Sequence, residues 1–257
     1  MIASIPRGPV EVPDVVASVA GGAPLVPLWR NELGGLTFRI DTPTPRVIKW
    51  SPNAEPELDL RPEIERLAWA GRYTTVARVL EHGGDERGHW VLLSALPGET
   101  AVSDRWRADS RTAVTAGGRG LRALHDRLPV DDCPFDWSVA MRIEAHHRFG
   151  VDERGRARLA ALGPPPPTDR LVVCHGDACA PNTLLDGAGR WVAHVDLGDL
   201  GVADRWADLA VATWSTHWNY GPGWEGALLD AYGIAPDQQR TAYYRRLWDP
   251  GTEALTI

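Results

Sequence analysis

The chain has 257 residues, of which 27 are Lys or Arg and 34 are Asp or Glu, giving a net charge of -7. This length can bury a substantial core in one large or two small lobes, and the acidic balance argues against nonspecific nucleic-acid binding, which needs a concentrated basic surface. Prolines interrupt the first residues, and no apolar stretch of about 18 residues follows. We therefore expect a cytoplasmic protein without a leader or membrane span.

The first part of the chain, to about residue 96, is predicted to form strands interrupted by one helix. The segment 31–38 is typical of a tight turn between two of these strands. Its Gly34 and Gly35 lack side chains, so the backbone there can approach a phosphate group closely.

Lys49 is the only lysine of the chain, and every other basic residue counted above is arginine. It lies at the end of the predicted strand 46–50. A compact ammonium group suits a phosphate pocket, where the larger, forked guanidinium of arginine is not equivalent. The alternative is a solvated lysine on an edge strand.

A helix is predicted over 61–69, with Pro62 in its first turn and an apolar stripe formed by Ile64, Leu67 and Ala68. Glu63 borders this stripe and is the preferred partner for a strand lysine. Helical spacing alone does not exclude Glu65.

The remainder is predicted to be mainly helical after a turn at Pro97 and Gly98. The expected helices cover 103–127, 138–148, 203–217, 224–232 and 236–248. Four of the twelve tryptophans lie within 206–224, where packing is favoured over a stacking surface for a ligand.

The most informative segment is 175–198, because it contains three polar side chains with the spacing of a phosphoryl-transfer loop. Asp177 is followed five residues later by Asn182, and Asp196 begins an Asp-x-Gly sequence. In protein kinases, such residues orient the attacking hydroxyl and hold Mg²⁺. Apolar strands are predicted before each acid, at 171–174 and 191–195. A single Gly-Asp pair would indicate only a turn, but the ordered set indicates a small-molecule kinase.

The segment 175–209 closely resembles the aminoglycoside 3'-phosphotransferase (kanamycin kinase) family. Weaker similarity covers almost the whole chain. It includes the sequences at 29–30, 49–50, 63–67, 92–98, 124–125, 133–136 and 244–245, all in family order.

The resemblance implies an α+β, two-lobed protein-kinase-like fold with a small β-rich N-lobe and a larger, mainly helical C-lobe. The N-lobe, residues 1–97, would bind the nucleotide, and residues 98–257 would carry the catalytic loop and acceptor site. Asp177 would be the catalytic residue, and Asn182 and Asp196 would be the Mg²⁺ ligands. ATP would be bound by Lys49, Glu63, Gly34, Gly35 and the hinge residues Ser94, Ala95 and Leu96.

The acceptor region departs from the family pattern. Asp199 stands where family members usually carry Arg, and the segment before the catalytic strand is short and not acidic. The carboxylates that could contact the acceptor are Asp152, Glu153, Asp199 and Asp249.

The expected activity is therefore transfer of the γ-phosphoryl group of ATP to a hydroxyl of an aminoglycoside antibiotic, the 3'-hydroxyl by resemblance, giving resistance. The partner would be a cationic aminosugar, with no nucleic acid or membrane, and the protein would be a monomer. One alternative is a kinase of the same fold that acts on another hydroxylated metabolite or antibiotic. The other is a nucleotide-binding module without turnover.

Overall fold

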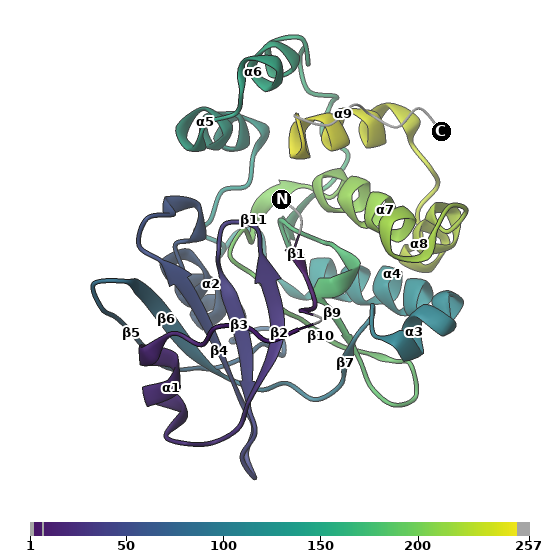
Figure 1. Ribbon diagram of the computed structural model, residues 1–257. Helices are drawn as coiled ribbons and strands as arrows, with labels where there is room; N and C mark the ends of the chain where they lie inside the picture. Colours follow the sequence, from purple (N-terminus) through teal and green to yellow (C-terminus); the bar gives the residue numbers. More distant parts are fainter. Residues whose placement is uncertain (1–2, 7, 251–257) are drawn as a thin grey trace. The chain divides into compact units, whose positions relative to one another are not determined.

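The computed structural model describes residues 3–6 and 8–250 (Figure 1). The chain consists of two compact units. Unit 1 comprises Met1–Arg72 and Val76–Leu96, and unit 2 comprises Tyr73–Thr75 and Pro97–Ile257. Within the described residues, no helix has the length and apolarity required to cross a lipid bilayer.

Unit 1 is built on a six-stranded antiparallel sheet with the order β1-β2-β3-β4-β6-β5. The strands are β1 (Ala3–Ser4), β2 (Leu25–Asn31), β3 (Leu36–Ile40), β4 (Arg46–Pro52), β5 (Val79–Gly84) and β6 (Gly88–Ser94). Helix α1 (Asp14–Ala20), a short 3-10 turn (Pro56–Leu58) and helix α2 (Arg61–Ala70) complete the unit.

The core of unit 1 lies between α1 and one face of the sheet. Val16 and Ala20 of α1 are buried against Phe38, Ile48 and Leu92. The prediction of a single helix in this region was wrong, because α1 is a second one. Its ends carry local signals, with Asp14 in the first turn and Gly21 in the left-handed conformation (φ 60°) after the last.

Unit 2 contains two small antiparallel sheets surrounded by helices (Figure 1). One sheet has the order β10-β9-β7 and the other pairs β11 with β8. These strands are β7 (Glu99–Thr100), β8 (Leu171–Cys174), β9 (Thr183–Leu185), β10 (Trp191–His194) and β11 (Gly201–Asp204). The helices are α3 (Asp104–Ala108), α4 (Ser110–Arg127), α5 (Val139–Phe149), α6 (Glu153–Ala160), α7 (Trp206–Tyr220), α8 (Glu225–Tyr232) and α9 (Gln238–Trp248), with a 3-10 turn at Ala180–Asn182.

Two helix predictions in unit 2 need correction. The segment 103–127 is divided at Asp109, whose carboxylate accepts a hydrogen bond from Thr112 N (3.3 Å) and so begins α4 anew. The segment from 203 does not start a helix, because it is the end of β11. Asp204 ends that strand, accepts a hydrogen bond from Trp206 N (2.9 Å), and so places the start of α7 at Trp206. Helix α6 was not predicted.

Candidate functional site

The loop 175–182 connects β8 to β9 and contains the candidate catalytic residue Asp177. Gly176 has a φ of 91°, and a Cβ atom at this position would collide with the carbonyl oxygen of Asp199. Only glycine is therefore compatible with this close approach of the two chain segments.

Asp208 of α7 fixes the start of this loop. Its carboxylate accepts hydrogen bonds from His175 N (2.6 Å) and Gly176 N (2.9 Å) and contacts His125 Nε2 at 2.9 Å. Burial alone would raise the pKa of Asp208, but the hydrogen bond from His125 and the electrostatic interactions with His125 and His175 hold the pKa below its usual value. Asp208 is thus an anion that orients the backbone next to Asp177.

Asp177 and Asn182 are brought together within the loop, as their five-residue spacing predicts. Asn182 Nδ2 donates to the backbone oxygen of Asp177 and to its carboxylate Oδ2, each at 3.0 Å. Asp177 Oδ1 is buried and accepts no hydrogen bond from the described residues. Burial raises the pKa of Asp177, and the nearby Asp196 carboxylate raises it further. Of the two carboxylate oxygens, Oδ1 is therefore the one that Asn182 does not engage.

Asp196 follows β10 and is the only described residue other than glycine with a positive φ, at 64°. This conformation is costly for aspartate and typically occurs at functional sites. The segment is linked to the loop, because Val195 N donates to Asn182 O (2.9 Å) and Val195 O lies 3.0 Å from His175 Nε2. Buried Leu197 and Leu200 anchor the following turn.

The donor atoms in this part of unit 2 fit a magnesium ion. Asn182 uses its Nδ2 toward Asp177, which leaves its Oδ1 as an acceptor, and the Asp177 and Asp196 carboxylates are close enough to interact. Oxygen atoms of carboxylates and amides are the ligands that Mg²⁺ prefers.

In unit 1, Lys49 and Glu63 form an ion pair in which Lys49 Nζ lies 2.7 Å from each carboxylate oxygen. Ile48 points into the core beside α1, so the next residue of β4 points to the opposite face of the sheet. Glu63 reaches this face from α2 and is 3% exposed. The predicted choice of Glu63 over Glu65 agrees with this geometry.

Gly34 and Gly35 form the turn between β2 and β3. Gly35 N donates to the Asn31 side chain (2.7 Å), Gly34 N donates to Asn31 O (3.2 Å), and Gly34 has a φ of 91°. Ser94, at the end of β6, accepts a hydrogen bond on its Oγ from Arg78 N (2.9 Å). Ala95 N donates to Pro45 O, and Leu96 is the last residue of unit 1.

The four candidate acceptor residues occupy different environments in unit 2. Asp152 caps α6 by accepting from Gly155 N (2.7 Å), and Glu153 is the first residue of that helix. Asp199 packs against Gly176, and Asp249 follows the last residue of α9. The capping role of Asp152 is structural, and the rest of α6 is basic, with Arg154, Arg156 and Arg158.

Three residues near the site were not identified from the sequence. Asp208 bonds to the loop backbone, and His125 contacts Asp208. The His125 ring also lies 2.8 Å from the Tyr232 hydroxyl. Ser215 of α7 accepts a hydrogen bond from Ala180 N (2.9 Å). Asp208 lies 33 residues from His175 in the chain, so their contact leaves no local periodic signal in the sequence.

A group formed by His125, Cys174 and Asp208 has donor atoms within 4.8 Å of one another. His125 is hydrogen-bonded to Tyr232, Asp208 to the loop backbone, and the Cys174 thiol to Asp204 O. We therefore interpret it as a structural network.

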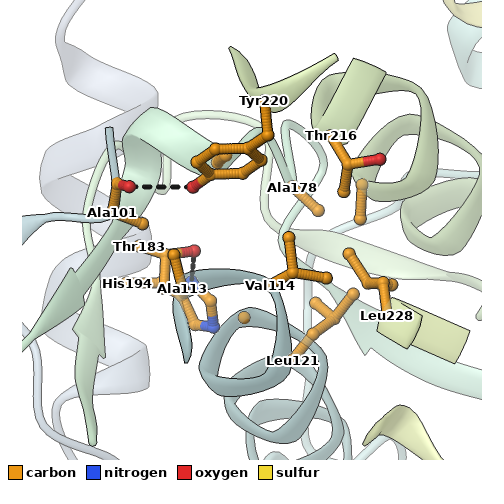
Figure 2. Close-up of a pocket in the computed structure, with 13 residues that line it drawn as sticks. Ala101, Ala113, Val114, Leu121, Ala178, Thr183, His194, Thr216, Tyr220 and Leu228 are labelled. Carbon is orange, nitrogen blue, oxygen red and sulfur yellow. Dashed lines mark hydrogen bonds between the residues drawn. The ribbon is translucent and has the colours of Figure 1, made fainter. Parts of the chain in front are cut away.

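A cavity of about 20 Å³ lies behind the loop, between α4 and α7 (Figure 2). Ala178 and Ala180 of the loop line it, with Val114 of α4 and Thr216 and Tyr220 of α7. The Tyr220 hydroxyl donates to Ala101 O (2.8 Å), so the polar atom of this ring is already paired. The cavity has room for about one water molecule.

The fold and the catalytic loop together define a phosphotransferase with a protein-kinase-like architecture, a β-sheet N-lobe and a helical C-lobe. Residues 31–244 match the phosphotransferase enzyme family, and the chain belongs to this family. The aminoglycoside 3'-phosphotransferase of Streptomyces fradiae is 36% identical over 213 residues, covering 74% of this chain and 78% of the relative.

Solved structures agree with this assignment. A crystal structure of aminoglycoside-3'-phosphotransferase of type VIII superposes with a TM-score of 0.76 at 32% identity, covering 92% of this chain and 97% of the other. An aminoglycoside phosphotransferase of Streptomyces rimosus in complex with ADP and streptomycin gives a TM-score of 0.65 at 27% identity, covering 93% and 98%. The resemblance stated from the sequence is confirmed.

Proposed function

We propose that this enzyme transfers the γ-phosphoryl group of ATP to a hydroxyl of an aminoglycoside antibiotic and thereby confers resistance. The observation that carries the proposal is the pair of Asp177 and Asn182, joined by a 3.0 Å hydrogen bond next to Asp196. The similarity to aminoglycoside 3'-phosphotransferases supports the acceptor class. The relative solved with ADP supports an adenine nucleotide as the donor.

Asp177 acts on the acceptor hydroxyl. Its buried Oδ1 accepts the hydroxyl hydrogen bond and orients the oxygen toward the phosphorus atom. Because the transition state of phosphoryl transfer is largely dissociative, the proton moves late, and Asp177 need not be a strong base. Its raised pKa assists acceptance of that proton.

We assign nucleotide binding to Lys49, Glu63, Gly34, Gly35 and residues 94–96. Lys49, held by Glu63, would contact the α- and β-phosphates, and the turn at Gly34 and Gly35 would approach them. The adenine contacts residues 94–96. Asn182 and Asp196 would hold Mg²⁺, which would neutralise charge on the phosphate oxygens. Residues 1–97 thus form the nucleotide-binding lobe and residues 98–257 the catalytic and acceptor lobe, in a monomer acting in the cytoplasm.

The test is ADP release from Mg-ATP with a panel of aminoglycosides that includes kanamycin, neomycin and streptomycin. We expect acceptor-dependent release that Asp177→Asn reduces by at least about 10³-fold, because a neutral amide cannot accept the proton. ATP binding, followed by calorimetry, should persist in the variant. Turnover retained in Asp177→Asn would remove this residue from its proposed role.

A second candidate function is phosphorylation of a different hydroxylated metabolite or antibiotic. It is favoured by the basic character of α6 and by the use of Asp152 as a helix cap, since both reduce the negative charge offered to acceptor amines. Slow ADP release with every aminoglycoside, together with nucleotide binding, would favour this function.

A further inference from the structure

Three buried donor atoms near the start of α5 have no hydrogen-bond partner among the described residues. They are Nη1 of Arg142 on α5, the hydroxyl of Tyr243 on α9, and Nε1 of Trp137, which lies just before α5. None of these side chains takes part in the proposed reaction. Buried polar groups are nearly always hydrogen-bonded, so three such donors in one region require an explanation.

Arg142 is a charged residue that the protein encloses almost completely. It is 3% exposed, and a guanidinium group stays protonated in proteins. Its guanidinium carbon lies 5.2 Å from the centre of the Trp137 ring. This cation–π contact is favourable, but the ring face does not accept hydrogen bonds in the plane of the guanidinium. A buried cation without hydrogen-bond acceptors is costly, so a negatively charged partner is expected beside it.

Helix α9 brings the Tyr243 hydroxyl to the same region. His146, one turn after Arg142, has its Nε2 atom 2.7 Å from the backbone oxygen of Leu247, which lies one turn after Tyr243. The two helices are therefore in contact next to Arg142 and Tyr243. Tyr243 is 5% exposed, and burial raises its pKa while the charge of the nearby Arg142 opposes that rise. The phenol is thus neutral and can donate a hydrogen bond.

The charges around Arg142 limit what such a partner can be. Asp199 and Asp208 interact with Arg142 electrostatically and oppose the lowering of its pKa by burial. The Asp208 carboxylate is already used by the loop backbone and by His125. A divalent anion would place excess negative charge near this buried carboxylate, whereas a monovalent anion balances the single charge of Arg142. The low exposure of Arg142 and Tyr243 also favours a small ion over a group carried by a larger molecule.

We propose that Arg142, Tyr243 and Trp137 bind a small monovalent anion of the size of chloride where α5 meets α9. The anion accepts hydrogen bonds from the three donors and neutralises the guanidinium. The site is joined to the frame of the catalytic loop, because Trp137 N donates to Val202 O (3.1 Å) of β11, and β11 pairs with β8, which leads into the loop. The anion is therefore a structural ligand of unit 2, and its binding does not depend on the identity of the acceptor.

The first experiment follows thermal unfolding of the full chain at constant ionic strength while chloride replaces gluconate, an anion too large for an enclosed site. We expect the Tm of the wild type to rise along a saturating curve, by about 3–6 °C at ten times the Kd for chloride. In Arg142→Met the rise should disappear, and without chloride this variant should be at least as stable as the wild type, because no uncompensated charge is buried. Tyr243→Phe should raise the apparent Kd for chloride about fivefold.

Two control variants make the same kinds of change away from the site. Arg148→Met removes an exposed arginine of the same helix, and Tyr220→Phe removes a hydroxyl that is already bonded to Ala101 O. Both variants should keep the chloride dependence of the wild type. A wild-type Tm that does not respond to chloride, or an equal response in Arg142→Met, would overturn the proposal.

A second measurement uses only the wild type and so does not depend on the folding of a variant. Crystals grown with bromide in place of chloride should show an anomalous difference peak at hydrogen-bond distance from Arg142 Nη1 and the Tyr243 hydroxyl. Density without an anomalous signal at this position would identify a water molecule there, and the proposal of an anion site would then be wrong.

Discussion

Lys49 lies on strand β4, and its partner Glu63 comes from helix α2. Its side chain is 16% exposed and that of Glu63 is 5% exposed, so the pair is largely shielded from water. Removing one member of such a pair leaves an uncompensated charge, which costs about 3–5 kcal/mol. The two residues therefore stabilise each other's orientation, in addition to any role with a nucleotide.

We predict that Lys49→Arg lowers kcat/KM for ATP at least about tenfold although the charge is kept. The guanidinium is planar and wider than the ammonium group, so it cannot keep both 2.7 Å contacts to Glu63 and still present the same point charge. Steady-state kinetics at saturating acceptor would measure the change.

The matched control is Arg39→Lys on β3, which alters an exposed ion pair with Asp41. Exposed pairs contribute about 0–1 kcal/mol, so this change should leave the kinetics unaffected. Wild-type activity in Lys49→Arg would show that the lone lysine has no special role.

At the scale of elements, the catalytic loop is held by helix α7 at two points. Asp208 in its first turn contacts the loop at residues 175 and 176, and Ser215, two turns later, contacts it at residue 180. Between these points the loop borders the small cavity shown in Figure 2. The packing behind the loop is therefore incomplete at this cavity.

We predict that Val114→Ile, which adds one methylene group toward this cavity, raises the free energy of unfolding by up to about 0.8 kcal/mol. Thermal unfolding should show a small increase in Tm with activity retained. Val211→Ile serves as the control, because Val211 is 0% exposed and does not line the cavity. The same addition there should overpack the core and cost about 1–3 kcal/mol. A loss of stability in Val114→Ile equal to that of Val211→Ile would contradict the prediction.

Across the whole molecule, stability depends on pH through buried ionisable groups. Burial, together with the neighbouring His175, lowers the pKa of His194 from 6.5 to about 3. The unfolded chain takes up a proton on this residue as the pH falls below about 6.5, whereas the folded chain does not until about pH 3. His194 therefore contributes stability above pH 6.5 that is lost progressively as the pH falls to about 3.

We predict that His194→Gln flattens this dependence. Below pH 6.5 the wild type should lose up to about 1.4 kcal/mol per pH unit through His194, and the variant should lack this component. Urea unfolding of the full chain, followed at pH 7.5, 6.0 and 5.0, would measure the difference in slope. Parallel slopes for the two proteins would show that His194 titrates normally in the fold.

The sequence by itself determined the order and spacing of Asp177, Asn182 and Asp196, the strands that precede the acids, and the strand that carries Lys49. These features are local, because they depend on neighbouring residues and on the periodicity of strands and helices. The same local signals gave the β-rich and helical halves and the family resemblance. They were less reliable for helix ends, as Asp109 and Asp204 show, because a side chain that caps a helix can also interrupt one.

Only the tertiary structure decided which residues support the site from a distance. The pairing of Lys49 with Glu63, the contact of Asp208 with the loop backbone and the link from Ser215 to Ala180 join residues 14 to 35 positions apart. It also distinguished the buried Trp214 from the exposed Trp218, although the two lie one turn apart on the same helix. The physical reason is that burial and hydrogen bonding depend on which elements pack together, and no periodic pattern within one element specifies that packing.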